Sequence, residues 1–278
     1  MYKHMLVDSR NIIYRAVYTS MDDDKKVHPV MLFFRFLMSY MRKYKSESVH
    51  LFWDEERDKV WRKNIFEDYK GGRDKSYKHD KEEVKRIVEE STEAIKEISK
   101  LLNCRSYERA KQEADDLIYA FCHEKVNERI IIISADADMM QIPFKFRNVD
   151  VFSPNSGKIC EMPEVSPVEM KCISGEMSDN IDGYYRIGPV NAKKIIQDDS
   201  KRSKLFKERG SSKYFRNRVL IDLSLSPHLF KNVIYISEAS LQDIKYNEKE
   251  MYNTIQRYKV RGLASEFTTG LVRFKGLK

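Results

Sequence analysis

The chain has 278 residues, enough for one large domain or two small ones, and 41% of them are hydrophobic, so it can bury a core. No apolar run approaches the roughly 18 residues that span a membrane, and the first residues lack the layout of a secretory signal. Composition therefore excludes an integral membrane protein, and we expect a cytoplasmic protein that does not bind membranes.

The net charge of +8 is unevenly distributed along the chain. Residues 183–278 hold 20 Lys and Arg against 9 Asp and Glu, whereas residues 1–182 hold 31 against 34. A basic C-terminal third beside an acidic first part suggests that the C-terminal third holds a polyanion. A solvated basic surface would explain the charge alone equally well.

Taken in chain order, three apolar strand candidates end in Asp. They cover residues 4–8, 49–54 and 130–138, and in the last of them four isoleucines precede Asp136 and Asp138. Four consecutive β-branched residues indicate a strand that is buried on both faces. Two acids at the end of such a strand repel each other, so positive groups or solvent must compensate them.

Helical patterns alternate with these strands. Apolar residues recur at helical spacing over three segments, 30–44, 82–102 and 112–124. Shorter strand candidates follow at 149–153 and 158–162, and from residue 166 onward the pattern is mainly helical and basic. The alternation predicts an α/β fold with a mainly parallel central sheet flanked by helices.

In an open parallel sheet, ligands bind beyond the carboxyl ends of the strands. Three strands bring Asp8, Asp54 and the Asp136–Asp138 pair to that edge, which predicts a shared acidic site. Further acids stand at the start of the helix 112–124 and in the polar segment 175–180, where each alone is typical of a helix start or a turn. The complete set of candidate acids is Asp8, Asp54, Glu113, Asp115, Asp116, Asp136, Asp138, Glu176 and Asp179.

This acidic set contains no histidine and no cysteine. An all-oxygen site suits Mg²⁺ or Mn²⁺ and argues against zinc. Two such ions about 4 Å apart can generate a hydroxide and stabilise both the attacking and the leaving oxygen of a phosphodiester. Divalent cations would also neutralise the acids that end the buried strand.

With these motifs the chain resembles the metal-dependent 5′-nucleases, also called flap endonucleases, and most closely their phage-type members. The motifs follow the family's order over nearly the whole chain: 6–8, 14–16, 52–54, 69–73, 113–116, 133–138, 175–181, 186–188, 215–218 and 221–223. The resemblance implies a PIN-like α/β nuclease core over 1–165, with a helical arch and gateway at about 64–102. It also implies a basic, helical, duplex-binding region over 166–278, packed on the core as one unit.

The resemblance assigns roles to the acids and to the gateway. It implies that a first metal is held by Asp8, Asp54, Glu113, Asp115 and Asp116. It implies that a second is held by Asp136, Asp138 and Asp179, with Glu176 at a position that is usually Asp. At the gateway, Lys70 and Arg73 would steer and polarise the scissile phosphate, and Tyr69 would stack on a base.

Residues 181–196 resemble the family's helix–three-turn–helix, which grips the phosphates of duplex DNA and binds K⁺ through loop carbonyls in related proteins. Arg186 stands where Gly is usual, and Pro189-Val190 stands where a small residue and Lys are common. The resemblance implies that DNA contacts come from Arg186, Gly188, Lys193, Lys194 and Arg216.

The implied activity is two-metal hydrolysis of DNA that has a free 5′ end, a 5′ flap or an RNA-primer junction, in replication or repair. It would need two or more Mg²⁺ ions, with Mn²⁺ as a substitute. We expect a monomer that works with a polymerase or a single-strand-binding protein, in the host cytoplasm if a phage encodes it.

Two alternatives remain open at this point. One is a non-catalytic, structure-specific DNA-binding protein, whose signature would be replaced acids. The other is an acidic-site ribonuclease that removes RNA primers, although that fold usually lacks both the 64–102 insertion and the basic helical C-terminal part.

Overall fold

The computed structural model describes residues 1–22, 27–71, 79–102, 104–226 and 247–260, and its centre is a six-stranded sheet. The strand order is β3-β2-β1-β4-β5-β6, parallel except for β6 at one edge. The strands are β1 (His4–Asp8), β2 (Ser48–Phe52), β3 (Cys104–Tyr107), β4 (Ile130–Ile133), β5 (Val149–Ser153) and β6 (Lys158–Ile159). The chain order reverses between β1 and β4, and such a switch point opens a crevice at the carboxyl edge.

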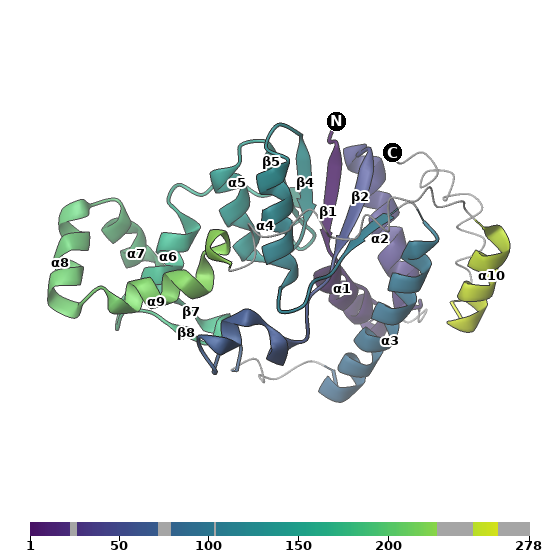
Figure 1. The fold of residues 1–278 in the computed structure, drawn as a ribbon, viewed down its shortest axis with the longest axis horizontal. Coiled ribbons are helices and arrows are strands. Elements are labelled where there is room, and N and C mark those ends of the chain that lie inside the picture. Colours follow the sequence, from purple (N-terminus) through teal and green to yellow (C-terminus); the bar gives the residue numbers. More distant parts are fainter. Residues whose placement is uncertain (23–26, 72–78, 103, 227–246, 261–278) are drawn as a thin grey trace.

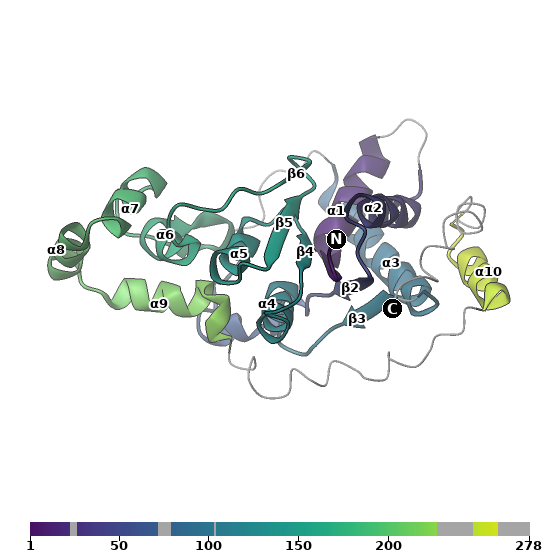
Figure 2. The same cartoon turned by 90° about the horizontal axis from the view of Figure 1, so that it is seen from above.

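Helices cover both faces of this sheet (Figures 1 and 2). Ile131 and Ile133 of β4 pack into the cluster built with α1 (Ser9–Asp22), α2 (Pro29–Tyr44) and α3 (Lys81–Lys100). Ile130 and Ile132 pack into the opposite cluster, with α4 (Ala114–Glu124) and α5 (Gln141–Lys145). All four isoleucines are fully buried, which confirms the prediction of a strand buried on both faces.

Residues 167–221 form a C-terminal lobe beyond one edge of the sheet (Figure 1). The lobe contains α6 (Pro167–Ser174), the hairpin β7 (Gly175–Glu176) and β8 (Ile181–Asp182), α7 (Pro189–Ile196), α8 (Asp199–Arg209) and α9 (Ser212–Ile221). It has its own apolar cluster, which includes Ile173, Leu205 and Leu220. The hairpin requires glycine at its base, because a Cβ on Gly183 would lie 2.2 Å from the backbone of Ser174.

The last described helix, α10 (Glu248–Arg257), lies at the other end of the molecule (Figure 1). It packs against α3, and its Met251 and Ile255 are buried in the cluster of α1–α3. The described residues of 166–278 therefore lie in two places, with 167–226 in and beside the C-terminal lobe and α10 on the core. Within the described part of the chain, no helix combines the length and apolarity needed to cross a membrane.

Short 3₁₀ turns carry the chain between these elements: η1 (Arg57–Lys59), η2 (Trp61–Asn64), η3 (Ala137–Met140), η4 (Met177–Asp179) and η5 (Leu223–Leu225). Three of them follow β2, β4 and β7, which are the places where the sequence puts acids. Two of these turns follow strands of the central sheet at its carboxyl edge, and the third follows β7 of the separate two-stranded hairpin. The described residues of the predicted arch segment, 64–71 and 79–102, lie between β2 and β3 and include α3.

A buried polar network closes the opposite edge of the sheet. His4 Nε2 lies 2.7 Å from Glu128 Oε2, and His4 Nδ1 lies 2.7 Å from Ser48 Oγ and 3.1 Å from His50 Nε2. His50 Nδ1 lies 2.9 Å from the Tyr107 hydroxyl. Burial lowers the pKa of His4 despite Glu128, and burial together with the charge of His4 lowers the pKa of His50 well below its usual value. Both imidazoles are therefore neutral near pH 7.

This network predicts that the free energy of unfolding falls as the pH drops through about 6.5. In that range His4 and His50 bind protons in the unfolded chain but stay neutral in the folded chain. His50→Gln should lower Tm at pH 8, where it loses hydrogen bonds, and should also reduce the loss of Tm between pH 8 and pH 5.5. The exposed His123→Asn is the control, and carboxyls that titrate in this range are common to all three proteins. An identical pH slope in wild type and His50→Gln would contradict this assignment.

Candidate metal centre

The carboxyl edge of the sheet gathers acids around one cavity of about 220 Å³. Asp8 is the last residue of β1, Asp54 follows β2 by two residues, and Asp136 follows β4 by three. The sheet register holds β1 between β2 and β4, so these three carboxylates converge at the switch point. The acids that line the cavity are Asp8, Asp54, Glu55, Glu113, Asp115 and Asp136, and its basic residues are Arg10, Arg57 and Lys70.

Asp8 and Asp54 are held by donors that set their orientation. Asp8 accepts the Asn11 N–H at 3.3 Å and the Ser134 hydroxyl at 2.8 Å, and Asp54 accepts the Ala114 N–H at 2.8 Å. Burial and then the charges of Asp54 and Asp136 raise the pKa of Asp8 to about 7. Burial likewise raises the pKa of Asp54. Both carboxyls are held in fixed orientations, and the positive charge around them is too small to offset the effect of burial on their pKa values.

The start of α4 contributes a second acidic group. Carboxylate oxygens of Glu113, Asp115 and Asp116 lie within 4.8 Å of one another. Burial, with the charges of Asp116 and Glu113, raises the pKa of Asp115 well above its ordinary value. Burial also opposes ionisation of Glu113, but Lys70 and Arg62 outweigh it and lower the pKa of Glu113 to about 2.

Asp116 differs from Glu113 and Asp115 because it does not line the cavity. It is fully buried, and Arg62 donates to its two oxygens at 2.8 and 2.9 Å. The Trp61 indole N–H donates to the same carboxylate at 3.0 Å. The resemblance implies that Asp116 helps to hold a metal, directly or through water. Its carboxylate lies within reach of those of Glu113 and Asp115 but is engaged by Arg62, so its role at the metal stays a prediction.

A third acidic group combines Asp138, Glu176 and Asp179. Lys171 of α6 forms ion pairs with Asp138 and with Glu176, so one ammonium joins the loop after β4 to the hairpin of the lobe. Burial raises the pKa of Asp138 to about 6 although Lys171 opposes the shift. Sequence reasoning missed Lys171; its place five residues before Glu176, within the region predicted to be helical and basic, was the available signal.

The gateway residues only partly match their predicted positions. Lys70 lines the cavity and forms an ion pair with Glu113. Its place in the lining is where a group that contacts a phosphate in the cavity would have to be. Tyr69 is 2% exposed, and its hydroxyl lies 3.1 Å from both Glu113 and Asp179. A buried ring offers no face to a base, so the expected stacking by Tyr69 is replaced by a buried bridge between two acids. Arg73 lies outside the described residues.

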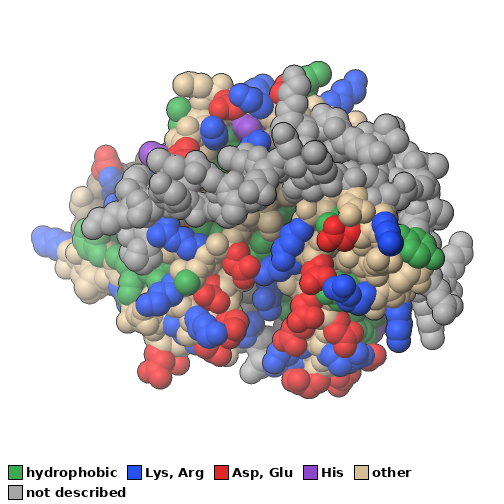
Figure 3. Space-filling view, turned by 45° about the vertical axis from the view of Figure 1, so that its right-hand side comes forward, with side chains coloured by type: hydrophobic (Ala, Val, Ile, Leu, Met, Phe, Trp, Pro, Cys, Tyr) green, Lys and Arg blue, Asp and Glu red, His purple; other side chains and the backbone are tan. Residues whose placement is uncertain are grey.

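The predicted DNA-contacting residues lie on the surface of the C-terminal lobe. Arg186, Gly188, Lys194 and Arg216 are exposed, and Arg186 has a left-handed φ of 59°, at a position where the family resemblance leads us to expect glycine. Lys193 pairs with Glu164 at 2.6 Å, and Arg216 pairs with Asp182. The stretch 181–196 contains the strand β8 and one helix, α7, so the two helices predicted within these bounds are not both there. On the face in Figure 3, basic and acidic side chains intermingle.

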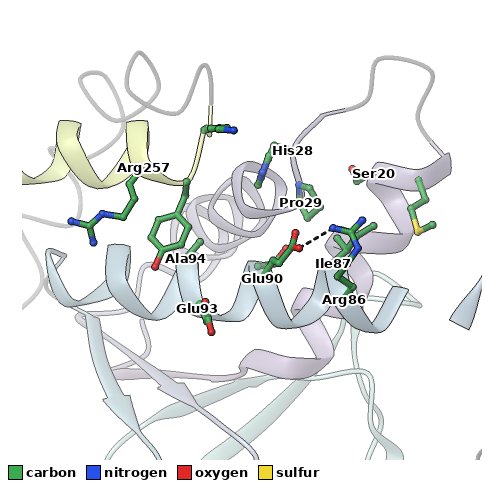
Figure 4. A pocket seen from close by; sticks show the side chains of 13 residues that line it. Ser20, His28, Pro29, Arg86, Ile87, Glu90, Glu93, Ala94 and Arg257 are labelled. Atoms are coloured by element: carbon green, nitrogen blue, oxygen red, sulfur yellow. Dashed lines mark hydrogen bonds and ion pairs between the residues drawn. The ribbon is translucent and has the colours of Figure 1, made fainter. Parts of the chain in front are cut away.

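A larger cavity of about 410 Å³ lies away from the acids, between α1, α2, α3 and the end of α10 (Figure 4). Its two acids, Glu90 and Glu93, come from one helix, and Glu90 pairs with Arg86 at 2.8 Å. This lining offers no convergent carboxylates. The cavity at the sheet edge is therefore the candidate site.

The donor set of that cavity fits divalent metal ions. Its acids are carboxylates from four separate parts of the chain, and none of its lining residues is histidine or cysteine. Hard cations such as Mg²⁺ and Mn²⁺ prefer these oxygens. The raised pKa values of Asp8, Asp54 and Asp115 mark the places where added positive charge would be most favourable.

Comparison with known proteins decides the family. The model of the 5′-3′ exonuclease N-terminal resolvase-like domain matches residues 3–169, more than half of the chain. The chain belongs to the 5′-3′ exonuclease family. Its membership confirms the resemblance to 5′-nucleases that the motifs indicated, and with it the assignment to nucleases of this class.

Relatives in this family include free-standing exonucleases and polymerases. The chain is 25% identical to a 5′-3′ exonuclease of Mycoplasmopsis pulmonis, covering 97% of this chain and 95% of that protein. It is 24% identical to DNA polymerase I of Lactococcus lactis, covering 96% of this chain but 33% of the polymerase. The chain thus spans about a third of that polymerase and nearly all of the exonuclease.

Solved structures with the same fold include two from bacteriophage T5. Its D15 protein, crystallised with metal ions, matches with a TM-score of 0.66 at 20% identity, covering 92% of this chain and 99% of that one. Its flap endonuclease in a complex with DNA and metal ions matches with a TM-score of 0.67 at 20% identity, with the same coverage. Human GEN1 bound to Holliday junction DNA matches at 0.52 and 12% identity, covering 98% and 72%. These likenesses confirm the predicted fold.

The charge imbalance of the cavity yields a test of metal binding. Asp8→Asn removes one of several buried like charges, so it should raise the metal-free stability, by about 1 kcal/mol. The same change should abolish most of the Tm gain that Mn²⁺ gives the wild-type protein. Differential scanning fluorimetry with and without Mn²⁺ checks both effects, with the exposed Asp58→Asn as control. A Mn²⁺-induced Tm gain of wild-type size in Asp8→Asn would place the metal elsewhere.

Proposed function

We propose that this member of the 5′-3′ exonuclease family hydrolyses DNA at free 5′ ends and at 5′ flaps, with two or more Mg²⁺ ions that Mn²⁺ can replace. The observation that carries the proposal is the convergence of Asp8, Asp54, Glu113, Asp115 and Asp136 on one cavity beside Lys70. When bound there, divalent ions supply a Lewis acid and activate water for attack on a phosphodiester.

The residues around the cavity suit a phosphate between the acids and the basic side chains. Lys70 and Arg10 line the cavity together with the acids, so they offer positive charge to a phosphate that approaches the metal side. Fixed cations that face developing negative charge stabilise the transition state. We propose that Lys70 takes this role and that Asp136, the exposed acid, is a direct ligand at the cavity mouth.

The C-terminal lobe suits the duplex beside the cut. Arg186, Lys194 and Arg216 are exposed on it, and phosphate contacts from Lys and Arg position a duplex without reading its sequence. The name of the T5 flap endonuclease complex, which holds DNA and metal ions, supports the same substrate class. The K⁺ site, the monomeric state, the polymerase or single-strand-binding partner and the cytoplasmic location stay predictions.

Replacement of one acid tests the reaction. Asp136→Asn should slow cleavage of a 5′-flap DNA by at least about 100-fold in Mg²⁺, because a fixed metal ligand is lost, and should leave duplex binding nearly unchanged. Single-turnover rates in Mg²⁺ and in EDTA, with a binding curve in Ca²⁺, measure both. The control is Glu89→Gln, an exposed position on α3. Cleavage by Asp136→Asn at the wild-type rate would refute the proposed site.

Replacement of Lys70 separates chemistry from binding. Lys70→Ala should lower the single-turnover rate by about 100-fold and weaken flap binding only slightly, because the ammonium acts at the cavity. Lys194→Ala, on the exposed face of α7, should do the reverse. Equal losses of rate and affinity in Lys70→Ala would show that Lys70 only holds DNA.

A further inference from the structure

One buried cation connects the metal centre to the C-terminal lobe. Arg62, in η2, is 1% exposed and donates hydrogen bonds from all three guanidinium nitrogens. Its Nη1 donates to Glu113 at 2.6 Å and to Asp116 at 2.9 Å, and its Nη2 donates to Asp116 at 2.8 Å. Its Nε donates to the Leu220 carbonyl at 2.8 Å. A buried guanidinium is stable only when its donors are satisfied in this way.

The Leu220 carbonyl belongs to α9, which holds the lobe together. Asn217 of α9 is fully buried, and its amide donates to the Cys172 carbonyl of α6 at 3.1 Å and to the Asp182 carbonyl of β8 at 2.8 Å. Movement of α9 therefore moves α6 and the hairpin. Arg62 ties this helix to the acids at the start of α4.

On the other side of Arg62, the Glu113 carboxylate is fixed by three donors from the segment 62–70. Arg62 and the Tyr69 hydroxyl lie 2.6 and 3.1 Å from one oxygen, and Lys70 binds the other. Glu113 is 6% exposed and lines the cavity. Its placement is thus set mainly by partners that are not themselves metal ligands, and such partners commonly control metal affinity about 10- to 100-fold.

We propose that Arg62 is a positioning residue that fixes Glu113 and α9 relative to each other, so that the metal centre and the C-terminal lobe form one structural unit. This inference rests on the proposed metal site but not on cleavage of DNA. It predicts that metal binding and the end of α9 respond to each other through Arg62.

A second anchor of α9 supplies a matched control. Gln141 donates to the Ile221 carbonyl at 3.0 Å and accepts the Leu223 N–H at 3.2 Å. It is 5% exposed and does not line the cavity of the acids. Gln141→Leu therefore loosens the same end of α9 and leaves Glu113 with all its partners.

The test measures Mn²⁺ binding by electron paramagnetic resonance in the absence of DNA. Arg62→Lys keeps a positive charge but loses the planar fork that serves Asp116, Glu113 and Leu220 together. We expect Mn²⁺ affinity to fall about 10-fold in Arg62→Lys and to stay at the wild-type value in Gln141→Leu, although both variants lose thermal stability. Equal Mn²⁺ affinity in all three proteins, or an equal fall in both variants, would overturn the proposal.

A measurement on the unaltered chain covers the case in which Arg62→Lys does not fold. Hydrogen exchange with and without Mn²⁺ should show added protection at the start of α4 and also at residues 218–225, because Glu113, Arg62 and Leu220 move as one. Protection at α4 with no change at 218–225 would refute the coupling. If wild type binds Mn²⁺ and fails to cut DNA, the proposed function fails and this inference is judged on its own data.

Discussion

Carboxylates at the end of a buried sheet repel one another, and the structure around them must compensate this repulsion. Two like charges about 4 Å apart cost about 4 kcal/mol at an effective dielectric constant of about 20, and this edge holds several. The fold cannot spread them apart, because β1, β2 and β4 are adjacent and parallel, so their ends coincide. Positive charge must therefore be supplied at the same edge.

The chain supplies that charge unevenly, and the unevenness divides the acids into two classes. Arg62 satisfies Asp116 and, with Lys70, lowers the pKa of Glu113 to about 2. Asp8, Asp54 and Asp115 keep raised pKa values because burial dominates at each of them, and at Asp8 and Asp115 the charge of neighbouring acids adds to it. The first class is compensated by the protein itself. The second class lines the cavity together with Glu113, and its deficit of positive charge is the physical reason that divalent ions would bind there.

The sequence was sufficient to predict the parts whose cause is local. Four consecutive isoleucines favour a strand buried on both faces, and apolar spacing over 30–44 and 82–102 gives α2 and α3 almost to the residue. The edge strand β3 was not predicted, because Cys-Arg-Ser-Tyr is short and partly exposed and has no apolar run. The acids that reach the cavity were identified because they follow strands, and strand ends converge by geometry.

Contacts that depend on packing between distant segments could not be predicted from the sequence. Arg62 stands in a polar stretch, and nothing near it indicates that a carbonyl 158 residues away and two acids about 50 residues away will enclose it. Tyr69 matches a motif associated with stacking, yet burial in the cluster of the C-terminal lobe assigns it to Glu113 and Asp179. Motifs identify which residues matter, whereas burial decides what each of them does.

The segment 57–71 therefore has a different role from the one its polarity indicates. It carries η1 and η2, it places Arg62 beneath Glu113, and it ends with the Lys70 N–H donating to the Asp179 carbonyl at 2.9 Å. The left-handed φ of 58° at Lys70 allows the chain to turn there while its side chain still points to Glu113. A solvated loop would satisfy none of these contacts. The segment instead sends a few buried side chains, Arg62 and Tyr69 among them, between the sheet edge and the C-terminal lobe, and these side chains link both parts to the acids.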